Sequence, residues 1–371
     1  LAGDFCQLEP VRNKDGPIYD SGTSTFLEWV NCFVELDGMH RFRDDMRWGH
    51  VLRRFRNGTL TLADIALINT RLVTNDTVLP NNIQYATYCN RSRDKINTAV
   101  FAKRCQETAA ANEGGIATDA VMIFADNIQI RDGSEAYHTL SHPEHLWCNC
   151  GEDDIETQNC RAGTPRRMDP VLKLFKHSPI MMTHNENVSC GRANGTCAVV
   201  DRVELKVGES PQLVEMDFGV GVPAVRACQV KSITLQHDNV DIRPQCFDLE
   251  PYDFPFIASL PIPEDLCLGE DNKREQLHMK CLQIPIVSNH ATTGHKLQGK
   301  TVVSILITDW NYTTNWPYVV LSRVKTLEGV FILQKISNEL DRYAMPPALS
   351  AMLTALSSCE PSYDEDDAYY I

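Results

Sequence analysis

The sequence predicts an α/β fold into which a small β-barrel or sheet is inserted. Amphipathic helical segments alternate with short apolar strands in the N-terminal third and again near the C-terminal end, which is the pattern of an α/β layer. Between them, over about 172–285, short β-type runs are separated by turn signals. A chain of 371 residues is long enough for two domains, each with its own core.

Helical spacing is clearest in the N-terminal third. Residues 24–36, "STFLEWVNCFVEL", begin with a Ser/Thr cap, although their last residues also suit a short strand. A second helix is expected within 41–58, and Gly58 would end it. Its buried face would consist of Val51, Leu52 and Phe55. A third helix begins after Thr61, which caps it together with Asp64 three residues on. Its buried stripe would consist of Ile65, Ile68 and Leu72.

Strand and helix signals continue along the chain. Residues 81–101 predict a strand, a turn at Asn90 and a helix start, and "DAVMIFADNIQI" predicts a strand. The stretch 105–170 is rich in Gly, His and Cys, so we expect loop and insertion there. The runs "TVVSILI" and "GVFIL" suit a buried parallel sheet. An amphipathic helix, "PPALSAMLTALSS", is expected near the C-terminal end.

Composition narrows the class of protein. The net charge of −14 argues against a nucleic-acid binder coated in Lys and Arg, but it leaves room for a local basic groove. No apolar run is long enough to span a membrane, so we expect no membrane partner. Fourteen Cys residues and sequons such as Asn57-Gly-Thr59 raise the alternative of a secreted glycoprotein. The irregular Cys spacing favours a reduced, intracellular compartment instead.

The stretch "GHKLQGKT", Gly294 to Thr301, matches the pattern of a phosphate-binding loop, G-x-x-x-x-G-K-[ST]. A true loop of this kind follows a strand and opens a helix, whose free backbone amides hold the phosphates. Here "SNHATTGHKLQ" predicts a helix capped by Ser288 or Asn289, and "TVVSILI" predicts a strand after it. The Gly299-Lys300-Thr301 end would therefore lie at a helix-to-strand exit, which argues against a phosphate loop.

The same stretch resembles the fifth motif of the petite-integration-frequency (PIF-type) DNA helicases, RecD-like members of helicase superfamily 1. Their relatives in rolling-circle transposons are similar too. "YVVLSRVKTLEGVFIL" resembles the sixth motif, and "LAGDFCQLEPV" resembles the third, with Glu9 where the family has a proline. "VLRRFRNGTLTLADIALINTR" resembles the helix pair after the fourth motif, and "SPIMMTHNENVSCGRANGT" resembles the segment ahead of an inserted barrel. Five landmarks in the family's order make the resemblance specific.

The resemblance implies a RecA-like parallel-sheet domain with an inserted small SH3-like β-barrel. Residues 1–30 would end a first RecA-like domain. Residues 31–371 would form the second, with an irregular insertion at about 105–170 and the SH3-like insertion at about 172–285. The phosphate loop and the Asp-Glu motif that binds Mg²⁺ would lie upstream, in the missing N-terminal RecA-like domain. We therefore expect the C-terminal half of a helicase, inactive by itself.

The resemblance also implies roles at the ATP cleft. Gln7 would sense the γ-phosphate, and Asp4 of the same motif would line the cleft with Gln298 and Gly299. Arg323 would be the arginine finger, which neutralises charge on the transferred phosphoryl group. Arg41 would be the fourth motif's arginine. Its match is poor because the family has Gln after this Arg, so Arg43 remains a rival. From residue type alone, Gln7 also suits a turn and Arg323 a helix surface.

On the DNA side, Thr293, His295 and Lys296 would face the single strand. Asn185 and Asn194 would contact it near the barrel, although both residues are more typical of turns. The implied activity is ATP-driven 5′–3′ unwinding of DNA, with ATP and Mg²⁺ as cofactors. Single-stranded DNA and a duplex or fork would be the partners, in the nucleus or alternatively the mitochondrion. The other hypothesis is a truncated or transposon-derived relative that only binds single-stranded nucleic acid.

A cluster of His and Cys residues lies in "YHTLSHPEHLWCNCGEDDIETQNC", residues 137–160. Zinc sites use four such side chains at close spacing. The C-x-C spacing departs from the usual C-x₂₋₄-C knuckle, and no second knuckle follows. The sequence therefore favours an exposed polar loop, and we expect no bound metal.

Overall fold

The computed structural model describes most of the chain, and its contacts divide it into two compact units. Unit 1 consists of Leu1–Arg93 and Thr292–Ile371, and unit 2 of Asp94–Ala291. The described residues are 6–7, 39–112, 114–131, 134–136, 169, 171–238, 244–261, 274–312 and 315–357, without side chains for 127–136, 255–261 and 274–280. The helix expected at 24–36 lies outside them. Among the helices described, none is both long and apolar enough to cross a membrane.

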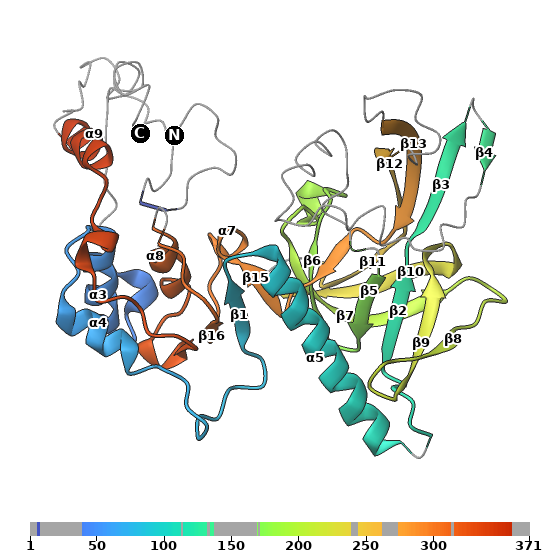
Figure 1. Ribbon diagram of the computed structural model, residues 1–371, viewed down its shortest axis with the longest axis horizontal. Helices are drawn as coiled ribbons and strands as arrows, with labels where there is room; N and C mark the ends of the chain where they lie inside the picture. The colour runs from blue at the N-terminus through green and yellow to red at the C-terminus, as the bar shows by residue number, and fades with distance from the viewer. Residues whose placement is uncertain are drawn as a thin grey trace. The chain divides into compact units, whose positions relative to one another are not determined.

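Unit 1 is built on a four-stranded sheet in the order β15-β1-β16-β17 (Figure 1). These strands are β15 (Ala291–Thr293), β1 (Gln84–Thr87), β16 (Ile305–Ile307) and β17 (Val330–Ile332). β16 pairs in parallel with β1 on one side and with β17 on the other. The parallel sheet predicted from the two short apolar runs is therefore confirmed. Parallel strands need long crossover connections, which is why sequence neighbours are not sheet neighbours here.

Two sides of this sheet carry different cores. Ile305 and Ile307 contribute to a large core with Trp48, Trp316 and Val320, whereas Leu306, between them in sequence, joins a smaller cluster on the other side. This division follows from the alternation of side chains along a strand. The large core is completed by η1 (His40–Phe42), α3 (Met46–Arg56), α4 (Leu62–Asn69), α7 (Gly294–Leu297), α8 (Trp316–Leu321), η6 (Leu327–Gly329) and η7 (Leu340–Tyr343).

The predicted start of α4, the stop after α3 and the C-terminal helix are found in unit 1, although α4 ends at Asn69, before Leu72 of its predicted stripe. Thr61 and Asp64 form a complete capping box on α4. Gly58 ends the turn after α3 at a φ of 69°, and a side chain there would meet the backbone of Met345. The predicted C-terminal helix is α9 (Pro347–Ser357), whose apolar face packs on Cys6 of the third-motif segment.

The described residues of unit 2 form three sheets and most of one α-helix, which begins at the end of the first segment of unit 1. The helix is α5 (Asn90–Ala111), and the first sheet has the order β5-β2-β9-β8 (Figure 1). Its strands are β5 (Val171–Phe175), β2 (Ala120–Phe124), β9 (Gly221–Arg226) and β8 (Gln212–Glu215). One face packs on α5 through Phe101, Cys105 and Ala109. The opposite face packs on the second sheet through Ile123, Leu172 and Val225, among others.

The second sheet has the order β11-β10-β7-β6-β14 and the third β12-β13-β3-β4. The second comprises β6 (Pro179–Met182), β7 (Cys197–Leu205), β10 (Val230–His237), β11 (Cys246–Leu249) and β14 (Ile286–Ser288), with the short helices η3 (Val188–Cys190) and η4 (Ala227–Gln229) between them. The third comprises β3 (Asp126–Arg131), β4 (Ser134–Ala136), β12 (Tyr252–Pro261) and β13 (Arg274–Gln283). No closed barrel is found among these described strands.

Two boundaries differ from the sequence prediction. The stretch 105–170 is not loop throughout, because α5 continues to Ala111 and β2, β3 and β4 follow before residue 137. Ala-rich "CQETAAA" extends the helix, since Ala has the highest helix propensity. The helix expected over "SNHATTGHKLQ" is also wrong. Residues 286–288 and 291–293 are strands, and only Gly294–Leu297 is helical.

Candidate functional site

Arg323 lies just after α8 and is buried, with 2% of its surface exposed. Its Nε donates to the carbonyl of Val319 at 2.7 Å, and Nη2 donates to the hydroxyl of Ser322 at 2.7 Å. Nη1 donates over longer distances, 3.5 Å to the carbonyl of Leu297 and 3.4 Å to that of Lys300. Burying a charge is costly unless it is hydrogen-bonded, and these neutral oxygens satisfy the guanidinium. The side chain is therefore held in one plane, with Nη1 bound least tightly.

Ser322 connects two of the predicted arginines. Its hydroxyl accepts from Arg323 and donates to the carbonyl of Val319, and its own carbonyl accepts from Nη1 of Arg41 at 3.0 Å. Arg41 lies in η1 and is partly buried. The rival Arg43 is exposed, and within the described part of the chain its side chain pairs with the neighbouring Asp44 at 3.9 Å. The structure therefore brings Arg41, and not Arg43, to Arg323.

The segment 294–300 forms the other side of this site. It turns from β15 into the single-turn helix α7, and Gly299 leaves it at a φ of 81°. Lys300 donates its backbone N–H to Leu297, whose carbonyl also accepts from Arg323. Helix α7 thus begins directly after a strand, but Gly299, Lys300 and Thr301 follow its C-terminal end. The fan of free amides that a phosphate loop requires is not formed at these three residues.

Predicted cleft and DNA residues in this segment reach solvent to different degrees. His295, Gln298 and Gly299 are exposed, whereas Thr293 and Lys296 are partly buried. A Cβ on Gly299 would have no atom within 4 Å, so the backbone there is open to a close approach. Gly294 is the opposite case, because a Cβ would lie 2.3 Å from Nε1 of Trp316. The segment is therefore tightly packed at Gly294 and open at Gly299, and the side chains that could contact a ligand lie between these two glycines.

Asn185 and Asn194 lie in unit 2, in the connection between β6 and β7. Both are exposed, and the side-chain oxygen of Asn185 accepts from the backbone N–H of Asn194 at 2.8 Å. One of the two therefore has a structural role, as the turn preference of Asn predicts. Asp4 lies outside the described residues. Gln7 is described and partly buried, next to Cys6 of the α9 core.

Sequence reasoning missed two residues that organise the site. Ser322 lies within the segment that resembles the sixth motif, but no sequence pattern distinguishes its hydroxyl as a partner of Arg323. Asp45 caps α3 through Trp48 N–H at 2.9 Å, and its second oxygen accepts from Leu327 N–H at 3.0 Å. An Asp before an apolar helix predicts the cap. The contact with Leu327 depends on the fold alone.

The His/Cys cluster at 137–160 lies outside the described residues. In the part of the chain that is described, no group of His, Cys, Asp or Glu side chains is arranged to hold a metal ion.

Comparison with solved structures places this geometry in a known fold. The chain is similar to the Pif1 helicase from Candida albicans, with 16% identity and a TM-score of 0.57 over 95% of this chain. It is also similar to Bacteroides Pif1 bound to single-stranded DNA, with 20% identity and a TM-score of 0.54 over 88% of this chain. A Pif1 helicase from Bacteroides in complex with ADP-AlF₃ and single-stranded DNA is similar with 18% identity and a TM-score of 0.53 over 88% of this chain.

This chain has the fold of the Pif1 helicases. The resemblance predicted from the five motifs is thereby confirmed at the level of the fold. The chain spans 57% of the length of the Bacteroides Pif1 chain and 67% of the Candida one. No protein-family model and no curated protein sequence matches it. The likeness to Pif1 therefore lies in structure and in local motifs rather than in overall sequence identity.

Proposed function

We propose that these 371 residues are the C-terminal portion of an ATP-dependent DNA helicase that moves 5′ to 3′ on a single strand. The observation that carries the proposal is the hydrogen-bonded connection of Arg41, Arg323 and the 297–300 loop within one parallel-sheet unit. These are the positions to which the motif resemblance assigns the second domain's part of an ATP site. The Pif1 structures, one of which holds an ATP analogue and single-stranded DNA, support the same assignment.

Under this proposal, unit 1 contains the second RecA-like domain, and residues 1–30 end the first. The strands within 172–285 correspond to the SH3-like insertion. Gln7, together with Asp4 and the phosphate loop of the first domain, supplies the remaining side of the ATP cleft. Mg²⁺ accompanies ATP there, on ligands outside these residues. The protein acts in DNA repair, recombination or other genome maintenance, in the nucleus.

The geometry suggests how Arg323 would act. Its short bonds from Nε and Nη2 fix the plane of the guanidinium, while Nη1 would exchange its longer bonds to the carbonyls of Leu297 and Lys300 for a phosphate oxygen. A fixed planar cation stabilises the charge that spreads over a transferred phosphoryl group, and such arginines contribute about 10³–10⁵ in rate. Movement of Nη1 would release the carbonyls of Leu297 and Lys300. ATP hydrolysis would thus be linked to the loop that presents His295 and Lys296 to the strand.

The decisive experiment measures DNA-stimulated ATP hydrolysis in a protein that carries this chain behind a RecA-like domain with a phosphate loop. Arg323→Ala should reduce turnover by about 10³ or more, with a much smaller effect on DNA binding. Because Arg323 is buried, circular dichroism must show that the variant is folded. Arg323→Lys, which keeps the charge and loses the planar fork, is the companion variant. Unchanged turnover in both folded variants would exclude the finger assignment.

The 371 residues alone should not hydrolyse ATP. Turnover by the isolated chain that disappears in Lys300→Ala would show that the phosphate-loop interpretation of "GHKLQGKT" was dismissed wrongly.

Binding of single-stranded DNA can be tested on the chain by itself. We expect Lys296→Ala to weaken binding of an oligothymidylate and to reduce the salt dependence of binding by about one charge. Lys335, which is exposed elsewhere in unit 1, provides the matched control. Equal effects of Lys296→Ala and Lys335→Ala would mean that the 294–300 segment does not meet the strand.

A further inference from the structure

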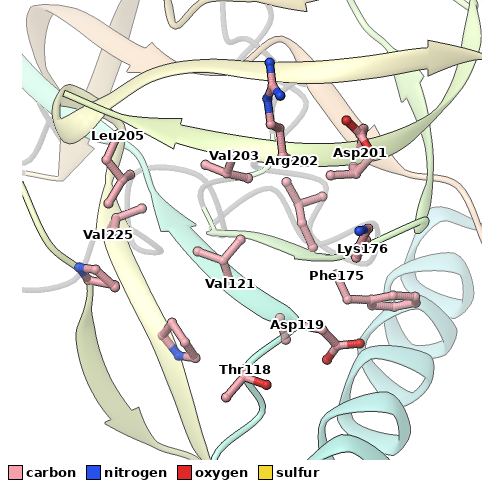
Figure 2. A pocket seen from close by; sticks show the side chains of 15 residues that line it. Thr118, Asp119, Val121, Phe175, Lys176, Asp201, Arg202, Val203, Leu205 and Val225 are labelled. Carbon is pink, nitrogen blue, oxygen red and sulfur yellow. The ribbon is translucent and has the colours of Figure 1, made fainter. Parts of the chain in front are cut away.

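Unit 2 contains a cavity of about 270 Å³ that no part of the proposed helicase site uses. Residues of β2, β5 and β9 in the first sheet and of β7 in the second sheet line it. Val121 and Val225 line it from the first sheet, and Val203 and Leu205 line it from β7 (Figure 2). Val121, Val203 and Leu205 are only partly buried, although they pack on the core between the sheets. The cavity therefore has apolar walls on two opposite sides.

Two backbone irregularities meet at one end of this cavity. In β7, Arg202 pairs with Thr234 and Val200 with Leu235, so Asp201 is an extra residue in a β-bulge. Bulges redirect side chains and are frequent next to functional sites. In the turn after β5, His177 has a φ of 66°, which is unusual for a residue other than Gly.

The bulge and the turn are joined by hydrogen bonds. His177 N–H donates to the carbonyl of Val200 at 2.7 Å, and Val200 N–H donates to the carbonyl of Ser178 at 3.0 Å. The bulge residue Asp201 and the turn residue Lys176 are consequently held on the same side of the cavity, as Figure 2 shows. Backbone strain that the surrounding structure maintains is a recurrent feature of binding sites.

The charges of Lys176 and Asp201 are not used within the described part of the chain. Neither side chain makes an ion pair or hydrogen bond there, so their charged atoms lie more than 4.0 Å apart despite their common location. Lys176 thus offers a donor and Asp201 an acceptor at this side of the cavity, which is also lined by Asp119, the ion-pair partner of Arg104. A ligand that has an acceptor next to a donor can form hydrogen bonds with Lys176 and Asp201 at the same time.

We propose that this cavity binds one nucleobase. A base has apolar faces that suit Val121 and Val203, and its hydrogen-bonding edge carries a donor next to an acceptor. Lys176 donates to the ring carbonyl or nitrogen, and Asp201 accepts from the adjacent N–H. The volume suits a single ring system, because pockets for drug-sized ligands are about 300–1,000 Å³. An aromatic side chain of a partner protein fits less well, since indole offers a donor only and phenylalanine offers neither group.

The test compares thymidine with N3-methylthymidine, in which the donor next to the carbonyl is replaced by a methyl group. Saturation-transfer NMR on the chain should show thymidine bound at least about tenfold more tightly, because a charge-assisted hydrogen bond is lost in the methylated nucleoside. Asp201→Asn, which keeps the shape of the side chain, should remove most of this discrimination. Lys176→Met should weaken both nucleosides.

Lys206→Met is the matched control, because Lys206 is an exposed charge next to Leu205 in sequence and does not line the cavity. It should leave both affinities unchanged. Val203→Phe, which fills the cavity, should abolish binding while the thermal transition shows that the chain is folded. This second variant keeps the test valid if a charge variant unfolds.

The source of the base is decided by repeating the comparison in a single-stranded pentathymidylate with a central N3-methylthymidine. Discrimination that is retained in the strand and lost in Asp201→Asn indicates a base of a nucleic acid, and discrimination with the nucleoside alone indicates a free metabolite. The proposal is overturned if thymidine shows no saturation transfer at millimolar concentration, or if Asp201→Asn leaves the preference intact. Preferential binding of N-acetyltryptophanamide would likewise overturn it, in favour of a protein partner.

Discussion

Nη1 of Arg41 donates a hydrogen bond to the backbone carbonyl of Ser322, 3.0 Å away, although 281 positions separate the two residues in sequence. We predict that Arg41→Ala lowers the free energy of unfolding by about 1 kcal/mol, because a charged donor to a partly buried carbonyl is lost. Arg43→Ala is the matched control and should stay within about 0.5 kcal/mol, since Arg43 is exposed. Urea denaturation of the chain measures both. Equal losses would contradict the distinction between the two arginines.

The packing of Gly294 on Trp316 gives a second prediction. A Cβ at residue 294 would lie 2.3 Å from Nε1 of the buried indole, so Gly294→Ala must displace Trp316 from the core. We expect a loss of about 2–3 kcal/mol in the free energy of unfolding, as for other overpacked cores. Gly299→Asn serves as the control, because Asn tolerates a positive φ and no atom obstructs its side chain. Thermal unfolding that is equally affected by both changes would show that this contact is not tight.

Buried thiols should react slowly with alkylating reagents. Burial raises the pKa of Cys281 to about 12 and that of Cys105 to about 11, and both side chains are fully buried. Because the thiolate is the reactive form, a short iodoacetamide pulse at pH 8 should modify exposed Cys246 well before either of them. Peptide mapping by mass spectrometry reads the result, and modification under denaturing conditions provides the reference. Early alkylation of Cys281 in the folded chain would contradict its burial.

Burial lowers the pKa of His290, which stacks on Phe175, to about 4. Between about pH 6.5 and pH 4 the unfolded chain therefore binds a proton that the folded chain does not, so stability falls as the pH falls. This residue contributes at most about 1.4 kcal/mol per pH unit to the slope of the free energy of unfolding against pH. His290→Phe keeps the stacking and should flatten the slope, although a part remains because burial also lowers the pKa of His237. Exposed His177, changed to Asn, should leave the slope unaltered.

Local patterns in the sequence predicted the elements of unit 1 well. The capping box of Thr61 and Asp64, the glycine stop at residue 58 and the apolar runs of the parallel sheet each depend on neighbouring residues only. The segment "SNHATTGHKLQ" was predicted wrongly because its structure depends on residues that are distant in sequence. Residues 291–293 become the strand β15 through their place at the edge of a sheet beside β1, and a single-sequence pattern does not contain that partner.

The residues of the candidate site stay a prediction, and the connections between them could not be read from the sequence. Motif resemblance pointed to Arg41 and Arg323, whereas their shared partner Ser322, whose carbonyl accepts from Arg41 and whose hydroxyl accepts from Arg323, required the three-dimensional arrangement. The cavity of unit 2 was not predicted at all. Asp201 is distinguished only by a bulge, which depends on the register of β7 against β10.

Unit 1 is formed by two segments that are far apart in the sequence, so the ribosome synthesises them at different times. β1 emerges early, but β16, its partner in the sheet, follows roughly 200 residues later. At translation rates of about 5–20 residues per second, Trp48 and its apolar neighbours wait about 10–40 s for the rest of their core. Unit 2 is contiguous and can fold during this interval. The nascent chain should therefore depend on chaperones that shield the part of unit 1 that precedes unit 2, and slowing elongation should lower the yield of folded protein.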